Sequence, residues 1–188
     1  YYGVDFMAMI GIIGGTGMGS PDILKGYRHF KKHTPYGPPS SKISSGKING
    51  CDVAALARHG DNHSIPPGRV NFRANIWALK DLGVTHILAV TAVGSLREEI
   101  APGHIVFPDQ FIDRTTNRSS TFFEGPEVCH IPMAEPFCPK LRQRLSDAAG
   151  ECGIPCHSQA TVITIEGPRF STKAESRMFR MWGADIIN

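Results

Sequence analysis

The sequence predicts an α/β fold in which a mixed, largely parallel central sheet is flanked by helices in a three-layer αβα arrangement. Apolar, β-branched runs at 85–90 and 161–165 each neighbour a stretch with helical spacing, at 70–82 and 173–182. Alternating strand and helix patterns imply right-handed crossovers between parallel strands. The dipeptide Asn49-Gly50 between two strand-like runs adds an antiparallel hairpin, so the sheet is expected to be mixed.

Composition suits a single globular domain. The 188 residues are 41% hydrophobic and 20% charged, and the net charge of +3 is spread along the chain, so no nucleic-acid partner is expected. No apolar run approaches the roughly 18 residues of a membrane span and residues 1–9 do not resemble a signal peptide, which favours the cytoplasm. We interpret residues 1–9 as a tag or disordered N-terminus and residues 10–188 as one domain.

The chain contains five cysteines, an odd number in a chain too large to need disulfide support. Three residues separate Cys152 from Cys156, which matches neither the redox motif nor half of a usual zinc ribbon. The sequence therefore predicts reduced, structural thiols and no metal. The cysteines are Cys51, Cys129, Cys138, Cys152 and Cys156.

The first strand-like run, Ile10–Gly14, ends in a turn that includes Gly15, Thr16 and Gly17. Glycines leave backbone N–H groups free to face an anion, and the Thr16 hydroxyl adds a donor, so the favoured ligand is phosphate. The dinucleotide fingerprint fails because Ser20 stands where its last glycine belongs, and the Walker loop sequence is absent. A turn that only lets the chain pass a neighbouring strand remains the alternative.

The next segments predict a short helical turn over Pro21–Arg28, a loop over Thr34–Pro39 and the hairpin strands Ser41–Ile48 and Cys51–Ala57. Ile65–Gly68 is a rigid connector.

A helix over Val70–Leu82 is expected to end at Gly83 and to lead into a central strand over Thr85–Val90. Short strands over Ile105–Phe107 and Gln110–Ile112 follow.

Asp113–Gly125, which contains Phe122 and Phe123, is predicted to be irregular and to act as a lid or partner surface. Pro139 opens a helix whose apolar stripe comprises Leu141, Leu145, Ala148 and Cys152, with Arg142 facing outward. A buried strand over Thr161–Ile165, a loop over Glu166–Ser171, a helix over Lys173–Trp182 and a strand beginning at Ala184 complete the chain.

Four predicted strand ends carry residues suited to binding an oxyanion and a purine. Ligands bind beyond the carboxyl ends of strands in open α/β sheets. Arg58 offers a bidentate fork and His59 a ring N–H, although each has a structural alternative as an ion-pair or interface residue. Arg169 and Glu166 are expected to pair with each other or with neighbours. The proposed phosphate shell comprises Thr16, Arg58, His59, Thr91 and Ala92, and Phe170 and Ser171 are available to a base.

Eight segments along the chain resemble the methylthioadenosine phosphorylases, within the trimeric purine nucleoside phosphorylase superfamily. They are IGIIGGTG, ALARHG, VNFRANIWALK, GSLREEI, FIDRTT, VCHIPMAEPFCP, TIEGPRFST and WGADIIN. The resemblance implies a nucleoside phosphorylase-like fold and phosphorolysis of 5′-methylthioadenosine to adenine and 5-methylthioribose 1-phosphate.

The resemblance also implies roles for individual residues. Thr16, Arg58, His59, Thr91 and Ala92 would hold phosphate, which is a co-substrate, so no cofactor is implied. Phe170 would pack on the purine and Ser171 would contact its edge. His130 looks like the residue that this family lends to a neighbouring subunit, which implies a homotrimer.

The family pattern continues past position 188 through a methionine-threonine pair and aspartates that anchor adenine. We therefore expect residues 10–188 to be a domain without its C-terminal part, with the purine-anchoring catalytic residue unassigned and the 188-residue chain inactive by itself. Phosphorolysis of 6-oxopurine nucleosides or methylthioinosine is an alternative, because Ser171 does not separate amino from oxo bases. A non-catalytic fragment that binds phosphate or nucleoside is another.

Overall fold

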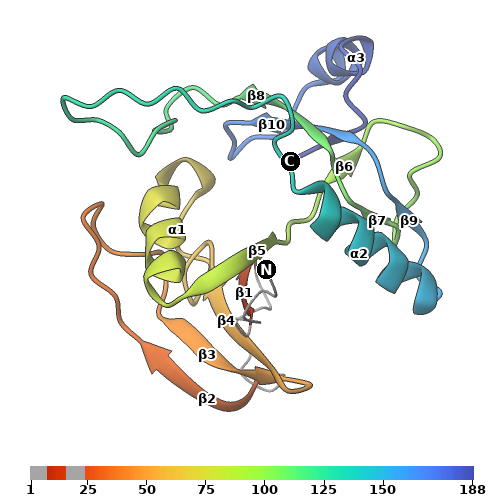
Figure 1. Ribbon diagram of the computed structural model, residues 1–188. Helices are drawn as coiled ribbons and strands as arrows, with labels where there is room; N and C mark the ends of the chain where they lie inside the picture. The colour runs from red at the N-terminus through yellow and green to blue at the C-terminus, as the bar shows by residue number, and fades with distance from the viewer. Residues whose placement is uncertain (1–7, 16–23) are drawn as a thin grey trace. The chain divides into compact units, whose positions relative to one another are not determined.

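The computed structural model describes residues 8–15 and 24–188. Residues 1–7 belong to the predicted tag or disordered N-terminus and lie outside the described residues, as do Thr16 and Gly17. The chain divides into two compact units, Tyr1–Thr91 and Ala92–Asn188, each of which combines strands and helices (Figure 1). The predicted α/β class is therefore confirmed.

The first unit contains a mixed five-stranded sheet in the order β2-β3-β4-β1-β5. β1 pairs in parallel with both β4 and β5, whereas β3 pairs antiparallel with β2 and β4. The parallel and antiparallel parts correspond to the predicted crossover and hairpin. The strands are β1 (Met9–Gly14), β2 (Lys25–Phe30), β3 (Ile43–Ile48), β4 (Cys51–Ala57) and β5 (Val84–Ala89).

The hairpin between β3 and β4 has the predicted two-residue turn. Ile48 lies opposite Cys51, and the two residues between them have positive φ angles of 48° at Asn49 and 85° at Gly50. Two successive positive φ values define the turn whose twist matches that of the flanking strands, and asparagine and glycine adopt them at little cost. The local sequence therefore determines the register of this hairpin.

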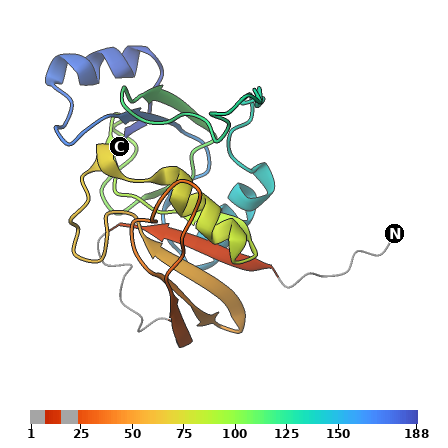
Figure 2. The ribbon, with the colours of Figure 1, turned by 90° about the vertical axis from the view of Figure 1, so that its left-hand side faces the viewer.

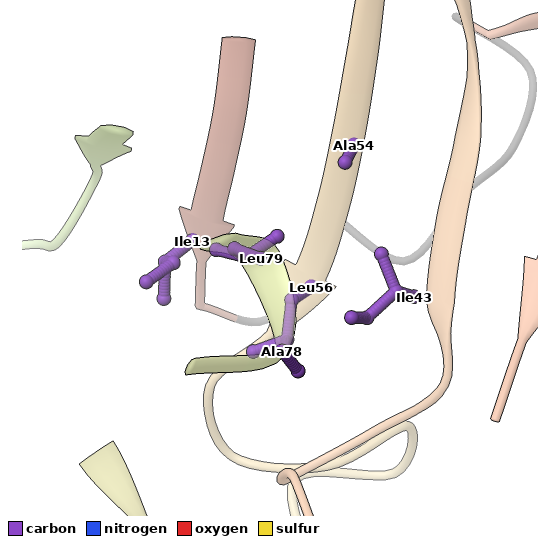
Figure 3. Close-up of a cluster of buried hydrophobic side chains, with 6 residues drawn as sticks. All are labelled: Ile13, Ile43, Ala54, Leu56, Ala78 and Leu79. Carbon is purple, nitrogen blue, oxygen red and sulfur yellow. The ribbon is translucent and has the colours of Figure 1, made fainter. Parts of the chain in front are cut away.

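Helix α1 (Phe72–Asp81) covers the sheet of the first unit (Figures 1 and 2). The Asn71 side chain caps its first turn by accepting from the Ala74 amide at 3.1 Å, and Gly83 follows its last turn with φ +89°. Its apolar face is part of the main hydrophobic core (Figure 3). The core residues are Ile13, Ile43, Ala54, Leu56, Ala78 and Leu79.

Two predictions for the first unit are wrong. Lys25–Arg28, predicted to be part of a helical turn, lies in β2, because pairing with β3 outweighs a weak local preference. β5, predicted to be a central strand, lies at the end of the sheet order among the described strands. β-Branched composition reports strand preference and not the number of neighbouring strands.

The second unit has two small sheets, so the described strands do not form one continuous central sheet. A four-stranded sheet has the order β6-β11-β10-β8, and β7 pairs in parallel with β9. β10 is parallel to both β8 and β11. The strands are β6 (Gly94–Ser95), β7 (Ile105–Val106), β8 (Gln110–Arg114), β9 (Cys156–His157), β10 (Thr161–Ile165) and β11 (Ile186–Ile187).

Helix α3 (Lys173–Met181) packs its Phe179 ring, which is 3% exposed, against Ile163 of β10. The other helix of the unit, α2 (Pro139–Glu151), begins at the proline that the sequence indicated. In the described residues, no helix is both long and apolar enough to cross a bilayer.

The predicted apolar stripe of α2 faces the interior only in part. Ala149 is buried, whereas Ala148 and Cys152 are exposed. Adjacent alanines give the same periodicity signal, so the pattern does not decide which one faces the interior. Arg142, predicted to face outward, is half-buried and donates from Nη1 to the Ser158 carbonyl.

A buried asparagine joins α1 to the loop before β3. Asn75 is 1% exposed, accepts from the Ser40 amide at 2.8 Å and donates to the Ser40 hydroxyl at 2.9 Å. Next to it, the Ser41 hydroxyl accepts from the Ala57 amide at the end of β4 at 3.0 Å. These contacts fix the loop against the strand end that precedes Arg58.

We predict that Asn75→Ala lowers the free energy of unfolding by about 1–3 kcal/mol, because the Ser40 amide loses its buried acceptor. Urea unfolding of the purified protein measures the effect. Lys80→Ala, on an exposed position of the same helix, is the control and should stay within about 0.5 kcal/mol of wild type. Equal stability of the two variants would contradict a structural role for Asn75.

Candidate active site

Three parallel strand ends meet at one edge of the first unit's sheet. Gly14 of β1 lies opposite Ala57 of β4, and Ile13 lies opposite Ala89 of β5. The next residues continue the pairing, since the Arg58 amide donates to the Gly14 carbonyl at 2.8 Å. The register therefore sets Arg58 beside the glycine turn, at the sheet edge where ligands bind in open α/β folds.

The Arg58 guanidinium is held across the ends of β4 and β5. Its Nη2 donates to the Val90 carbonyl at 2.9 Å, and the Val90 amide donates to the Ile13 carbonyl at 2.9 Å. Burial lowers the pKa of Arg58, yet a guanidinium stays charged at neutral pH. One bond orients the fork and leaves further N–H donors for an oxyanion.

The glycines of the opening run have different physical explanations. A Cβ on Gly11 would lie 2.8 Å from a Val84 methyl group, so close side-chain packing disfavours a larger residue there. A Cβ on Gly15 would lie 3.7 Å from Arg58 Nη2, which is an ordinary contact. Side-chain packing therefore explains Gly11 and leaves Gly15 available to the ligand hypothesis.

His59 is oriented by a short closed loop. Its Nδ1 lies 2.9 Å from the Ile65 carbonyl oxygen, and the Ile65 amide donates back to the His59 carbonyl at 2.9 Å. A carbonyl oxygen only accepts, so Nδ1 carries the hydrogen and Nε2 of the neutral ring is an acceptor. Nε2 can donate to an oxyanion only when the ring is protonated. The His63 ring lies beside it, with ring centroids 4.7 Å apart.

The predicted phosphate shell is brought together in part. Arg58 and His59 are consecutive, and Thr91 follows the residue whose carbonyl orients Arg58. Ala92 comes next and begins the second unit. Thr16 lies outside the described residues.

The sequence led us to expect that the four strand ends belong to one sheet, and this expectation is wrong. The first three belong to the sheet of the first unit, whereas Glu166–Ser171 follows β10 in the second. Alternating strand and helix patterns predict parallel pairing but do not say which strands share a sheet.

Glu166 clamps the loop after β8 to the end of β10. Its carboxylate accepts from the amides of Thr116 at 2.6 Å and Asn117 at 2.9 Å, and from Arg118 Nε at 3.2 Å. Arg118 Nη2 also donates to the carbonyls of Ile165 at 3.3 Å and Glu166 at 2.9 Å. Glu166 thus pairs with a neighbour and not with Arg169.

The same contacts lower the pKa of Glu166 to about 2. The two backbone hydrogen bonds from Thr116 and Asn117 are the main causes, and Arg118 adds to them. Glu166 is therefore an ionised acceptor at neutral pH and not a proton donor to a leaving base.

The residues predicted to contact the nucleoside lie in the second unit. Phe170 is 91% exposed, and the Ser171 hydroxyl lies 2.8 Å from the Ser176 hydroxyl. His130 is exposed within a segment that has neither helix nor strand, and its neighbours Ile131 and Met133 are 59% and 52% exposed. Among the described residues, no group of three or more histidine, cysteine or acidic side chains is arranged to hold a metal.

The sequence of residues 9–188 matches the family model described as "Phosphorylase superfamily". The chain therefore belongs to the phosphorylase superfamily. Similar proteins include S-methyl-5'-thioadenosine phosphorylases from Xenopus tropicalis, 60% identical over 185 residues, and Thermofilum pendens, 56% identical over 178 residues. A solved structure of methylthioadenosine phosphorylase from Schistosoma mansoni in complex with tubercidin matches with a TM-score of 0.92 and 42% identity.

These matches extend over nearly all of this chain but not over all of the relatives. They cover 95% of the chain, against 66% of the Xenopus protein and 68% of the Thermofilum protein. The match with the Schistosoma structure covers 96% of this chain and 72% of the Schistosoma chain. The chain thus spans about two thirds of the length of the curated relatives that it matches.

We predict that Glu166→Gln makes the stability of the fold less dependent on pH in the acid range. The folded-state pKa lies below the ordinary value of 4.5, so the ionised carboxylate stabilises the fold above that pH. This contribution is lost as pH falls from 4.5 toward 2. The variant should be less stable than wild type at neutral pH, and the difference should shrink in acid.

Thermal unfolding across a pH series measures this effect. Glu127→Gln, at an exposed carboxylate, is the matched control and should follow the wild-type curve. A Glu166→Gln curve parallel to that of wild type would contradict the clamp.

Proposed function

We propose that the protein carrying this sequence catalyses phosphorolysis of 5′-methylthioadenosine, giving adenine and 5-methylthioribose 1-phosphate. The observation that carries the proposal is the Arg58 fork, held by Val90 at the ends of three parallel strands. The printed names of the similar proteins and the tubercidin complex of the Schistosoma enzyme support the same nucleoside class.

The proposed chemistry requires an anion that is both nucleophile and electrostatic partner. A phosphate oxygen attacks C1′ of the ribose while the bond from C1′ to the purine nitrogen breaks. Positive charge develops on the ribose in the transition state, and a phosphate dianion held nearby stabilises it. Phosphate is a co-substrate in this scheme, which calls for no cofactor and no metal.

The proposed binding roles follow the family motifs. Thr16, Arg58, His59, Thr91 and Ala92 hold phosphate. Phe170 packs on the purine and Ser171 contacts its edge, and the leaving base takes up a proton. The exposed segment around His130 supports a subunit contact in a homotrimer.

A cytoplasmic location is part of the proposal. All five cysteines lie in the described part of the chain and are free thiols, and four of them are exposed. Exposed free thiols persist in the reducing cytosol more readily than in an oxidising compartment.

Phosphorolysis of 6-oxopurine nucleosides is the second candidate function. The observation that favours it is the Ser171 hydroxyl. Either that hydroxyl or its Ser176 partner can be the donor in their hydrogen bond, so Ser171 can present a donor or an acceptor to a base. Incubation of the full-length protein with methylthioadenosine, methylthioinosine or inosine, with and without phosphate, separates the candidates by base release.

Adenine release that requires phosphate supports the proposal. Equal or faster turnover of inosine would overturn the adenine assignment. Binding without phosphate-dependent release would favour a non-catalytic nucleoside-binding protein.

We predict that Arg58→Ala raises the KM for phosphate by about 10- to 100-fold, because a hydrogen bond to a charged group contributes about 1.5–3 kcal/mol. Arg58→Lys keeps the charge but loses the planar fork, so its KM should lie between those of the alanine variant and wild type. Initial rates at varied phosphate measure both. Arg28→Ala, on an exposed position of β2, is the control. An unchanged phosphate KM in Arg58→Ala would remove this side chain from the site.

A further inference from the structure

The loop that carries Phe170 and Ser171 is held by the guanidinium of Arg169, the residue before them. Arg169 contacts both carboxylate oxygens of Glu175, at 2.8 and 2.7 Å, from its two terminal nitrogens. Arg169 Nη1 also donates to the Phe170 carbonyl at 3.0 Å. The planar fork therefore ties the backbone of the exposed aromatic residue to the first turn of α3.

The same carboxylate fixes the end of the loop. Glu175 accepts from the Thr172 amide at 2.7 Å, and the Thr172 hydroxyl accepts from the Glu175 amide at 3.1 Å. This reciprocal pair is a capping box at the start of α3. The contacts from Arg169 and Thr172 lower the pKa of Glu175 to about 2, so it is ionised at neutral pH.

A third contact holds the side chain of Ser171, which lies between Phe170 and Thr172. The Ser171 hydroxyl lies 2.8 Å from the Ser176 hydroxyl, one turn into α3. The four residues 169–172 are thus joined to α3 through two side chains of that helix, Glu175 and Ser176.

A contribution to folding stability does not explain the contacts of Arg169 and Glu175. The Arg169 side chain is 68% exposed and that of Glu175 is 30% exposed. Ion pairs with such exposed partners contribute little to folding free energy. Arg169 nevertheless donates one hydrogen bond to the Phe170 carbonyl. Phe170 is 91% exposed, so its ring has contact area to offer a planar ligand.

We propose that Arg169, Glu175 and Ser176 are positioning residues. They hold Phe170 and Ser171 in the conformation that binds a purine base. The proposal rests on the proposed function. Ordering a loop before its ligand arrives removes an entropic cost from binding, so the nucleoside should gain affinity while phosphate does not. Ser176 additionally decides whether Ser171 presents a donor or an acceptor to the base edge.

Glu175→Gln is the sharpest test, because glutamine can keep the capping box while it loses the charge that binds Arg169. We expect the KM for methylthioadenosine to rise by about 3- to 10-fold, with the KM for phosphate unchanged within about twofold. Arg169→Gln should give the same rise. The double variant should be no worse than either single variant, because both remove one interaction.

Ser176→Ala tests the serine contact separately. We expect it to change the ratio of kcat/KM for methylthioadenosine to that for methylthioinosine by at least about threefold. Asp52→Asn, which breaks the exposed ion pair with Lys47 in the β3-β4 hairpin, is the control and should leave both substrates' constants unchanged.

The outcomes separate this inference from the proposed function. An active wild type whose Glu175→Gln and Arg169→Gln variants keep the wild-type nucleoside KM would overturn the positioning role alone. A parallel rise in the KM values of nucleoside and phosphate, with a lower unfolding temperature, would show a structural role and overturn it as well. Full-length wild-type protein that neither releases base with phosphate nor binds adenine in calorimetry would contradict the proposed function, and the inference with it.

Discussion

The candidate site depends on one hydrogen bond, which joins the Arg58 guanidinium to the Val90 carbonyl. Parallel pairing of β1 with β4 and β5 sets the two residues at the same edge of the sheet. A long cationic side chain has many rotamers in solution, and this bond with partial burial selects one. The remaining N–H groups of the fork then share a fixed direction, which is the precondition for binding an oxyanion strongly.

Local signals allowed much of the fold to be predicted. Asn49 and Gly50 define the hairpin, and the spacing of apolar residues defines α1 and α3. Non-local pairing was out of reach, since nothing in Lys25–Phe30 indicates its partner β3. For the same reason the sequence placed β5 centrally and did not divide the strands between sheets.

The site was predictable at the level of residue types and not of contacts. Arg58 and His59 follow a strand end, which the sequence indicates, but the bonds to Val90 and Ile65 depend on tertiary structure. Arg118 lies 48 residues from Glu166, and no spacing rule joins them. The capping box of Thr172 and Glu175 had a visible signal, threonine three residues before glutamate, that the sequence reading missed.

A crystal structure of the full-length protein, crystallised with phosphate and adenine, tests most directly the claim that Arg58 holds phosphate. It should contain a phosphate oxygen about 2.7–2.9 Å from a free Arg58 nitrogen, with the Val90 bond retained. Adenine should lie against the Phe170 ring. Phosphate bound elsewhere, with the Arg58 fork occupied by protein groups only, would contradict the claim that this residue holds the nucleophile.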